Sequence, residues 1–197
     1  LPEGIWESVI GSAVWQLRSN TQGLWGRASQ PGLHASMLAY LDAAGVQGDL
    51  IERLPWRSDG VLQSALELYP GLRILRQEPD EVLLGFLCSS NKRIVQIRHM
   101  VGMLAKTLGE PLGEGHFALP SWQVLAQARP EQLQSCALGY RASYIQETAQ
   151  QLSRQPNGAR AWSALTTSEL MERLQGLSGV GPKVASCVAL FGFGRLE

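Results

Sequence analysis

Residues 176–190 read Gly-Leu-Ser-Gly-Val-Gly-Pro-Lys-Val-Ala-Ser-Cys-Val-Ala-Leu, and this stretch decides how the second half of the chain folds. Its glycines, at 176, 179 and 181, predict a tight turn, because glycine reaches positive φ without strain. Pro182 suits the first position of a helix, where its missing N–H would have no partner. The stretch therefore predicts a turn followed by a helix over 182–193.

The segment before this turn carries its own helix signal. Thr166 and Glu169 have the spacing of a capping box, in which each residue satisfies a backbone N–H of the other. This predicts a helix over 167–175. The expected local structure is helix, turn, helix.

Such a turn offers a site for an anion. Backbone N–H groups at the turn and at the start of the second helix can bind a phosphate oxygen, and the helix dipole adds a modest attraction. We therefore expect the backbone of Gly179, Val180 and Gly181 to bind a DNA phosphate. A contact of this kind reads no base sequence.

A lysine and a cysteine follow on one face of the second helix. Lys183 lies in the first helical turn, and Cys187 is four residues further on. An amine whose pKa is lowered by burial, a neighbouring cation or the positive helix end can attack a sugar carbon and form a Schiff base. The alternative is that Lys183 only touches a phosphate and Cys187 packs as a small apolar residue. The spacing alone leaves both readings open.

The chain changes character near residue 80. Before this point, alternating apolar and polar residues predict antiparallel strands, and periodic segments predict two short helices. The expected strands are 5–10, 13–17 and 23–26, and the expected helices are 34–44 and 59–69. Trp6, Trp15 and Trp25 fall in the strand segments, so we expect them in the core.

After residue 80 the strand pattern is absent and helices follow one another, with proline and glycine between several of them. The expected ranges are 80–88, 91–108, 121–127, 130–137, 141–155, 167–175 and 182–193. The fold class is therefore α+β and predominantly α. A small antiparallel-sheet domain at 1–80 precedes a helical domain at 81–197.

The charge distribution differs between these two parts. Residues 1–80 hold 6 Lys and Arg against 9 Asp and Glu, whereas residues 81–197 hold 11 against 8. No acid occurs between Glu81 and Glu110, where four basic residues lie: Lys92, Arg93, Arg98 and Lys106. This run is either a solvated helix face or a surface that meets DNA phosphates.

Composition narrows the class of protein further. With 45% hydrophobic residues the chain is not disordered, and it has no apolar run of the length that spans a membrane. Its three cysteines have no metal-ligand spacing, so we expect no metal site and a reducing intracellular compartment.

Three ordered segments resemble one known family. Residues 177–187 are similar to the hairpin and active-site helix of the 8-oxoguanine DNA glycosylases, within the helix-hairpin-helix glycosylase superfamily. The segments Arg73-Ile-Leu-Arg-Gln-Glu-Pro79 and Phe86-Leu-Cys-Ser-Ser-Asn91 resemble the start of its helical domain, and Leu138-Gly-Tyr-Arg-Ala-Ser-Tyr144 resembles its Gly-Tyr-Arg loop. The resemblance places the helix-hairpin-helix at 167–193, in a glycosylase domain that is incomplete at its C-terminus.

The resemblance implies a role for each matched residue. Lys183 would be the catalytic amine, and Cys187 would pack on the extruded base. Asn91 would fill the space that the base leaves, Tyr140 would wedge into the opened stack, and Arg141 would read the unpaired cytosine. The alternatives are a helix cap for Asn91, a packed tyrosine and a surface arginine.

The chain departs from the family pattern in two ways. Gln96 stands where the family has a second cytosine-reading arginine, and Lys92 replaces a second asparagine, so opposite-base selection would be weaker or different. The family also places a catalytic aspartate shortly after the active-site helix, beyond the position of Glu197. We therefore expect an internal portion of a longer enzyme, weakly active or inactive on its own.

The expected function is base excision repair. A DNA glycosylase with AP lyase activity would remove 8-oxoguanine from duplex DNA by base flipping and Schiff-base chemistry. It would act as a monomer, in the bacterial cytoplasm or the nucleus, without a membrane. No cofactor would be required, although hairpin carbonyls could hold a structural cation. The alternatives are a non-catalytic helix-hairpin-helix module that binds DNA, and a glycosylase for another lesion.

Overall fold

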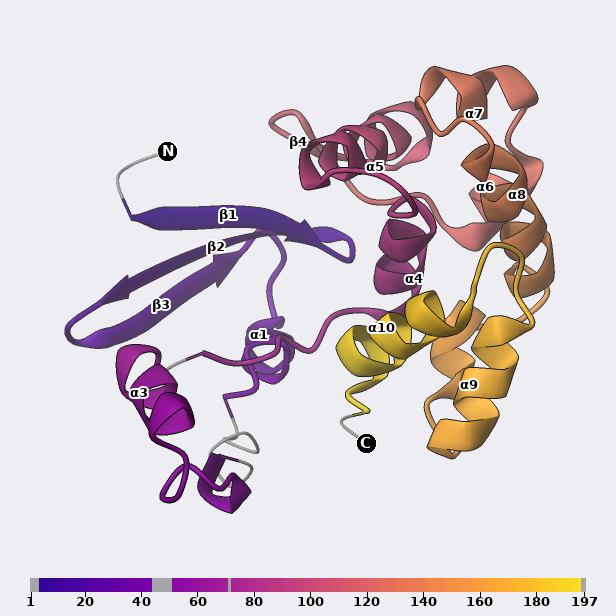
Figure 1. Cartoon of the computed structure of the whole chain (residues 1–197). Coiled ribbons are helices and arrows are strands. Elements are labelled where there is room, and N and C mark those ends of the chain that lie inside the picture. Colours follow the sequence, from indigo (N-terminus) through magenta and orange to yellow (C-terminus); the bar gives the residue numbers. More distant parts are fainter. Residues whose placement is uncertain (1–3, 44–50, 71, 196–197) are drawn as a thin grey trace. The chain divides into compact units, whose positions relative to one another are not determined.

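The computed structural model describes residues 4–43, 51–70 and 72–195 (Figure 1). By internal contacts the chain forms two compact units, one of residues 1–31 with 77–197 and one of residues 32–76. The three-stranded sheet thus belongs to the same unit as the helices of the second half. The domain boundary expected near residue 80 stays a prediction.

The sheet is a simple antiparallel meander. Its strands are β1 (Ile5–Ile10), β2 (Ala13–Asn20) and β3 (Gly23–Ala28), paired in the order β1-β2-β3. Alternate residues of β2, namely Ala13, Trp15 and Leu17, are buried, as strand periodicity requires. The expectation of a core position is therefore confirmed for Trp15. It is wrong for Trp6 and Trp25, which are 43% and 50% exposed. Trp25 pairs with Arg18 and so lies on the face of the sheet opposite to Trp15, whereas Trp6 pairs with Leu17 on an outer strand that has a neighbour on one side only.

Among its described residues, the unit of residues 32–76 includes the short helices α1 (His34–Tyr40) and α3 (Gly60–Leu68). Asp59 caps α3, because its Oδ1 accepts hydrogen bonds from the backbone of Val61 and Leu62, both at 3.0 Å. α1 ends before the predicted residue 44, since Asp42 takes a left-handed φ of 50°. Residue 44 itself lies outside the described residues.

The remaining helices agree closely with the sequence prediction, and their ends are set by proline, glycine and polar caps. They are α4 (Pro79–Leu87), α5 (Ile94–Leu108), α6 (Trp122–Gln127), α7 (Pro130–Ser135), α8 (Arg141–Leu152), α9 (Thr167–Gln175) and α10 (Pro182–Phe193). α4 lies among them and contacts α8 and α10. Its side chains Leu83, Leu84 and Leu87 are almost completely buried in the helical core.

Two elements of the second half were not expected. A two-stranded ribbon, β4 (Pro111–Gly113) with β5 (His116–Phe117), follows α5, so the expectation of no strand after residue 80 is wrong. Glu114 and Gly115 join its strands with φ values of 51° and 81°, as tight hairpins require. The 3-10 helix η1 (Gly158–Trp162) is the second addition. Both elements are too short for periodicity to reveal.

Within the part of the chain that the structure describes, no helix combines the length and the apolar character needed to cross a bilayer.

Candidate active site and nucleic-acid interface

The helix-hairpin-helix forms where the sequence predicts it. The side chain of Thr166 accepts a hydrogen bond from the backbone of Glu169 at 3.3 Å, and Glu169 Oε2 accepts one from the backbone of Thr166 at 2.8 Å. The Thr166 hydroxyl also donates to Glu169 Oε2 at 2.7 Å, and this bond, together with the one from the Thr166 backbone, lowers the pKa of the Glu169 carboxyl. The capping box therefore fixes the start of α9 and the direction from which the chain enters the hairpin.

One glycine supplies the positive φ of the turn. Gly179 has φ of 77°, whereas Gly176 has φ of −72° and continues the helical turn, and Gly181 has φ of −85° in the extended N-cap position of α10. The expectation of three positive-φ glycines is thus wrong for two of them. The reason is that a single left-handed residue already reverses the chain between α9 and α10.

The three predicted phosphate-binding residues have different surroundings. Val180 is 5% exposed, and its backbone N–H donates to the carbonyl of Leu177 at 3.2 Å. Gly179 and Gly181 are exposed on either side of it. The valine side chain therefore anchors the hairpin in the core while the two glycines leave backbone accessible. Phosphate binding by this segment stays a prediction.

Lys183 lies directly after the hairpin, and its role as an amine nucleophile stays a prediction. Pro182 and Lys183 are the first residues of α10, and the lysine side chain is exposed. Among the described residues, the Lys183 side chain has no ion pair and no hydrogen-bond partner. Cys187, one turn further on, is a half-buried free thiol. The amine is accessible to a ligand at the positive end of a helix.

Asn91 lies in a strained turn between α4 and α5. It is exposed and has a left-handed φ of 52°, a conformation that asparagine tolerates better than most residues. The side chain of Gln96 accepts a hydrogen bond from the backbone of Arg93 at 3.1 Å, so it caps α5. This explains why α5 begins at Ile94 and not at residue 91. Gln96 is thus engaged in the helix cap, whereas Asn91 is free to project.

Arg141 is buried, which the sequence did not suggest. It is 2% exposed, and its guanidinium donates to the carbonyls of Leu138 and Ser90. The same group lies 4.4 Å from the centroid of the Tyr140 ring and 3.1 Å from the Tyr140 hydroxyl. Arg141 therefore ties the Gly-Tyr-Arg loop to the residue that precedes Asn91. The predicted base-reading role of Arg141 stays a prediction.

A buried thiol lies near this arginine. Cys88 is fully buried, and burial raises the pKa of its thiol to about 12, although the charge of Arg141 acts in the opposite direction. Cys136 is also fully buried, and no disulfide links the three cysteines. Cys88 and Cys136 are structural thiols and not nucleophiles.

The structure thus brings three predicted site residues near one another. Asn91, Tyr140 and Arg141 are linked through the Ser90 carbonyl, although their segments lie about fifty residues apart, as the separation of 51 between Ser90 and Arg141 shows. Lys183 and Cys187 lie on α10 and make no direct bond to this group among the described residues. In the part of the chain that the structure describes, the hairpin is connected to Tyr140 through Tyr144 of α8.

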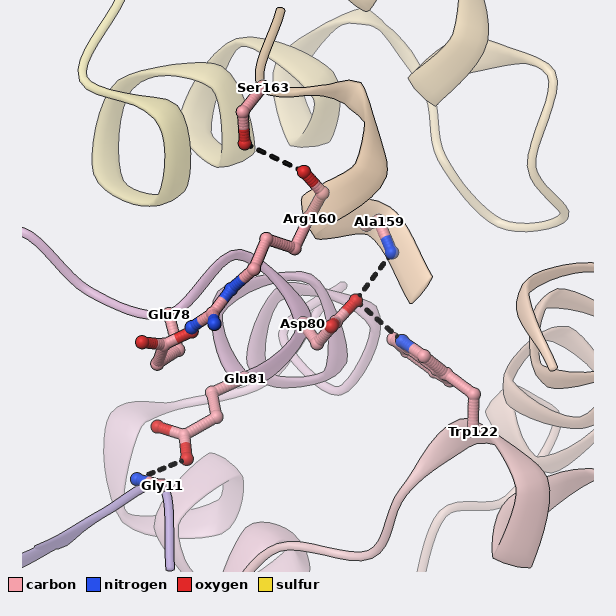
Figure 2. A network of polar contacts seen from close by, with 8 residues as sticks. All are labelled: Gly11, Glu78, Asp80, Glu81, Trp122, Ala159, Arg160 and Ser163. Carbon is pink, nitrogen blue, oxygen red and sulfur yellow. Dashed lines mark hydrogen bonds and ion pairs between the residues drawn. The ribbon is translucent and has the colours of Figure 1, made fainter. Parts of the chain in front are cut away.

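Sequence reasoning missed a polar junction at the start of α4, which we call the Asp80 junction (Figure 2). Asp80 Oδ1 accepts hydrogen bonds from Trp122 Nε1 and from the backbone of Ala159, both at 2.7 Å. Glu81 Oε1 accepts one from the backbone of Gly11 at 2.8 Å. The one signal in the sequence was a group of acids in the first turn of a helix, which the helix dipole already explains.

Burial dominates the electrostatics of the Asp80 junction. It raises the pKa of the Asp80 carboxyl despite the hydrogen bonds from Trp122 and Ala159. It also raises the pKa of Glu81, where the hydrogen bond from Gly11 acts in the opposite direction. Arg160 forms an ion pair with Glu78 at the exposed edge of the junction. The junction joins four segments of the chain and presents no free cation.

Comparison with known proteins identifies the fold. No protein-family profile matches the chain. MBOgg1, solved in complex with a low-affinity DNA ligand, superimposes with a TM-score of 0.89 and 29% identity over 99% of this chain and 68% of that one. The 8-oxoguanine glycosylase/lyase of Clostridium acetobutylicum gives 0.88 and 25% identity over 99% of this chain and 69% of its own. The fold and the hairpin therefore define a helix-hairpin-helix DNA glycosylase architecture.

Sequence comparison finds curated relatives of the chain. The N-glycosylase/DNA lyase OGG1 of Arabidopsis thaliana is 41% identical over 128 residues, which are 61% of this chain and 35% of that protein. By sequence and by fold, the chain is a relative of the N-glycosylase/DNA lyases, so the resemblance noted in the sequence is confirmed. The chain spans about a third of the length of this curated relative.

Proposed function

We propose that the protein is a DNA glycosylase with AP lyase activity that removes 8-oxoguanine from duplex DNA. The observation that carries the proposal is an exposed, unpaired lysine in the first turn of α10, directly after a glycine hairpin. Related proteins named 8-oxoguanine glycosylase/lyase support the choice of substrate. A lysine in this position serves both base excision and strand cleavage.

In the proposed reaction the damaged nucleotide leaves the base stack. Asn91 and Tyr140 are exposed and occupy the vacated space, which offsets part of the cost of unstacking, a few kcal/mol. Cys187 packs on the extruded base. The backbone at Gly179 and Gly181 holds a phosphate next to the lysine. Each of these roles is part of the proposal.

The neutral amine of Lys183 then attacks C1′ of the sugar. The bond from Nζ to C1′ forms as the glycosidic bond breaks, and the base leaves with the bonding electrons and takes up a proton. The attached nitrogen then loses one proton, and its lone pair breaks the C1′–O4′ bond. O4′ takes up a proton as the sugar ring opens, which leaves a protonated Schiff base between Nζ and C1′. Removal of a proton from C2′ expels the 3′ phosphate and cleaves the strand. A carboxylate that stabilises the developing positive charge of the sugar belongs to the proposal but is assigned to no described residue.

Borohydride trapping tests the proposal. Full-length protein is mixed with duplex containing 8-oxoguanine and reduced, and the expected product is a covalent protein–DNA adduct. Lys183→Gln removes the amine and should abolish the adduct. Lys106→Gln is the matched control, because Lys106 is an exposed lysine in the last turn of α5. An adduct that survives in Lys183→Gln would refute the proposed nucleophile.

The same experiment separates a second candidate, a helix-hairpin-helix module that binds DNA without chemistry. That candidate predicts DNA binding by the wild-type protein and no adduct under any condition. The observation that favours this second candidate is the exposed hairpin, because such a hairpin can bind a phosphate whether or not a lysine follows it.

A glycosylase for another lesion is the nearer alternative. Excision is measured on duplexes that carry 8-oxoguanine, an alkylated purine or thymine opposite guanine. The proposal expects the oxidised purine to be the preferred substrate. Repeating the measurement with each of the four bases opposite 8-oxoguanine tests the weaker opposite-base selection expected from Gln96.

The partner in this proposal is duplex DNA that contains an oxidised purine, bound by a monomer wherever the cell keeps its DNA. Amine chemistry of this type needs no cofactor. A structural cation at the hairpin carbonyls remains part of the proposal, and dialysis against a chelator followed by a binding measurement tests it. Binding that is unchanged after dialysis would argue against a chelatable cation.

A further inference from the structure

One face of α8 supports the hairpin. Thr148 Oγ1 donates to the carbonyl of Ser178 at 3.1 Å, and Ser178 Oγ donates to Glu147 Oε2 at 2.7 Å. Tyr144 precedes these residues by one turn, so its side chain projects from the same face. Figure 1 shows the loop between α9 and α10 beside α8. The hairpin is thus fastened to α8 at Ser178.

Tyr144 lies directly against the left-handed residue of the hairpin. A Cβ atom added to Gly179 would lie 2.8 Å from Tyr144 Cδ2 and 2.9 Å from Tyr144 Cβ and Cγ. With φ of 77°, this position favours glycine for its backbone, and the contact excludes a larger residue as well. The hairpin therefore rests on the base of the tyrosine ring.

The Tyr144 ring also packs against the ring of Tyr140. The two rings pack edge to face, with centroids 5.8 Å apart and planes at 76°. Tyr140 is 55% exposed, whereas Tyr144 is 38% exposed. The position of the Tyr140 ring is therefore fixed by two neighbours, the Arg141 guanidinium and the Tyr144 ring.

We propose that Tyr144 is a positioning residue that couples the projecting ring of Tyr140 to the hairpin. Because one side chain contacts both, a shift of the hairpin on binding a phosphate changes the support of the Tyr140 ring. Binding of a phosphate by the hairpin and insertion of the Tyr140 ring into the base stack are then coupled. The inference rests on the proposed function, since it gives Tyr140 and the hairpin their roles on DNA. The Tyr144 hydroxyl has no hydrogen-bond partner among the described residues, so the ring alone performs the coupling.

The first test uses two substitutions at this position. In Tyr144→Phe the ring is kept, and base flipping, followed by 2-aminopurine fluorescence next to the lesion, should match the wild type. In Tyr144→Leu both contacts are lost, and the flipped fraction should fall about two- to tenfold. The dependence of log affinity on log salt should become shallower by about one, because the hairpin loses its phosphate.

A stability control separates positioning from unfolding. Leu152 is fully buried on the same helix, two turns beyond Tyr144, so Leu152→Ala loosens α8 while the Tyr144 side chain and its two contacts are kept. It should lower the melting temperature while the salt slope stays at the wild-type value. The inference is overturned if Tyr144→Leu leaves flipping and salt slope unchanged. It is also overturned if Leu152→Ala alters both as strongly.

A double-mutant cycle tests the coupling itself. Tyr140→Ala and Tyr144→Leu are measured alone and together, and a shared action predicts that the double variant flips no worse than Tyr140→Ala. Additive losses would show independent roles and contradict the inference. Borohydride trapping of the wild-type protein is run in parallel. A missing adduct would reject the proposed chemistry, whereas an adduct with additive losses would reject only the coupling.

Discussion

The Asp80 junction and the hairpin that α8 supports are held together by different kinds of interaction. Each joins segments that are far apart in the sequence. At the junction, half-buried carboxylates accept hydrogen bonds from Trp122, Ala159 and Gly11, so these polar groups already have partners within the protein. At the hairpin, a ring contact and two hydroxyl bonds hold the backbone, while Lys183 stays exposed.

This difference separates polar groups that build the protein from those available to a ligand. A carboxylate with two buried donors cannot exchange them for a ligand without leaving the donors unpaired. A hairpin held by packing keeps its charged neighbours free. Substitutions at the junction should therefore act on stability, whereas substitutions around the hairpin should act on DNA.

The largest effect is expected at Gly158, which lies under the junction with φ of 52°. A Cβ here would lie 2.7 Å from Asp80 Oδ1 and 2.9 Å from Trp122 Cδ1. Gly158→Ala should lower the free energy of unfolding by about 3–5 kcal/mol, since backbone strain adds to the loss of the carboxylate contacts. Urea denaturation measures this.

Gly115→Ala is its matched control, because Gly115 also has positive φ, of 81°, but has no atom within 4 Å of an added Cβ. It should cost about 1 kcal/mol from backbone strain alone. Equal losses in the two variants would mean that the close approach at Gly158 does not matter.

Removing the acceptor is the next largest change. Asp80→Ala leaves Trp122 Nε1 and the Ala159 N–H without a partner and should cost about 2–4 kcal/mol. Asp80→Asn keeps an Oδ1 acceptor for both donors and should be much less destabilising. Thermal and urea unfolding of both variants check this. Equal losses would show that the charge, and not the hydrogen bonding, is what matters.

Comparison of the wild type with Asp80→Asn predicts how the free energy of unfolding depends on pH. Because burial raises the pKa of Asp80 above its ordinary value of 3.8, ionisation is less favourable in the folded state. The contribution of Asp80 to stability is therefore full below pH 3.8 and declines as pH rises through the folded pKa. The wild type should lose stability relative to Asp80→Asn over that range, measured by urea unfolding at successive pH values. A constant difference would contradict the assigned cause.

In the turn between α4 and α5, Lys92 and Arg93 are exposed beside Asn91. Replacing both by alanine should weaken DNA binding about tenfold and reduce the salt slope by about two, with little change in stability. Lys106→Ala is the comparison, since Lys106 lies about 20 Å further along α5. Fluorescence anisotropy over a series of salt concentrations measures both. Equal salt slopes in the wild type and both variants would show that Lys92 and Arg93 do not contact DNA phosphates.

The smallest effect is expected at Gln96. Gln96→Ala removes the hydrogen bond to the backbone of Arg93 and should cost about 0.5–1 kcal/mol of stability. Gln96→Glu keeps the acceptor and should restore most of the loss in thermal unfolding. If it does not, the cap is not what Gln96 contributes.

The sequence predicted those features whose causes are local. α9 and α10 have the predicted bounds, because a capping box, Pro182 and one left-handed glycine set their ends within a few residues. The strands likewise follow from alternation and turns. The family resemblance also came from contiguous segments. Local rules were enough for most of the fold.

Features that depend on distant partners were not predictable. Nothing near Asp80 in the sequence indicates that Trp122 and Ala159 supply its donors, 42 and 79 residues away. An arginine is usually exposed, yet the guanidinium of Arg141 is buried and donates a hydrogen bond to the Ser90 carbonyl. Tyr144 became prominent only through its contact with Gly179. The roles of Lys183 and the other matched residues on DNA stay predictions.

The burial of Cys88 has a practical consequence for labelling. A thiol with a pKa near 12 is almost entirely protonated at neutral pH, and alkylating reagents attack the thiolate. Cys136 is equally enclosed, whereas Cys187 reaches the surface one turn from Lys183. A maleimide dye added to the native protein should therefore attach at Cys187 and turn α10 into a fluorescent reporter without any cysteine having to be removed.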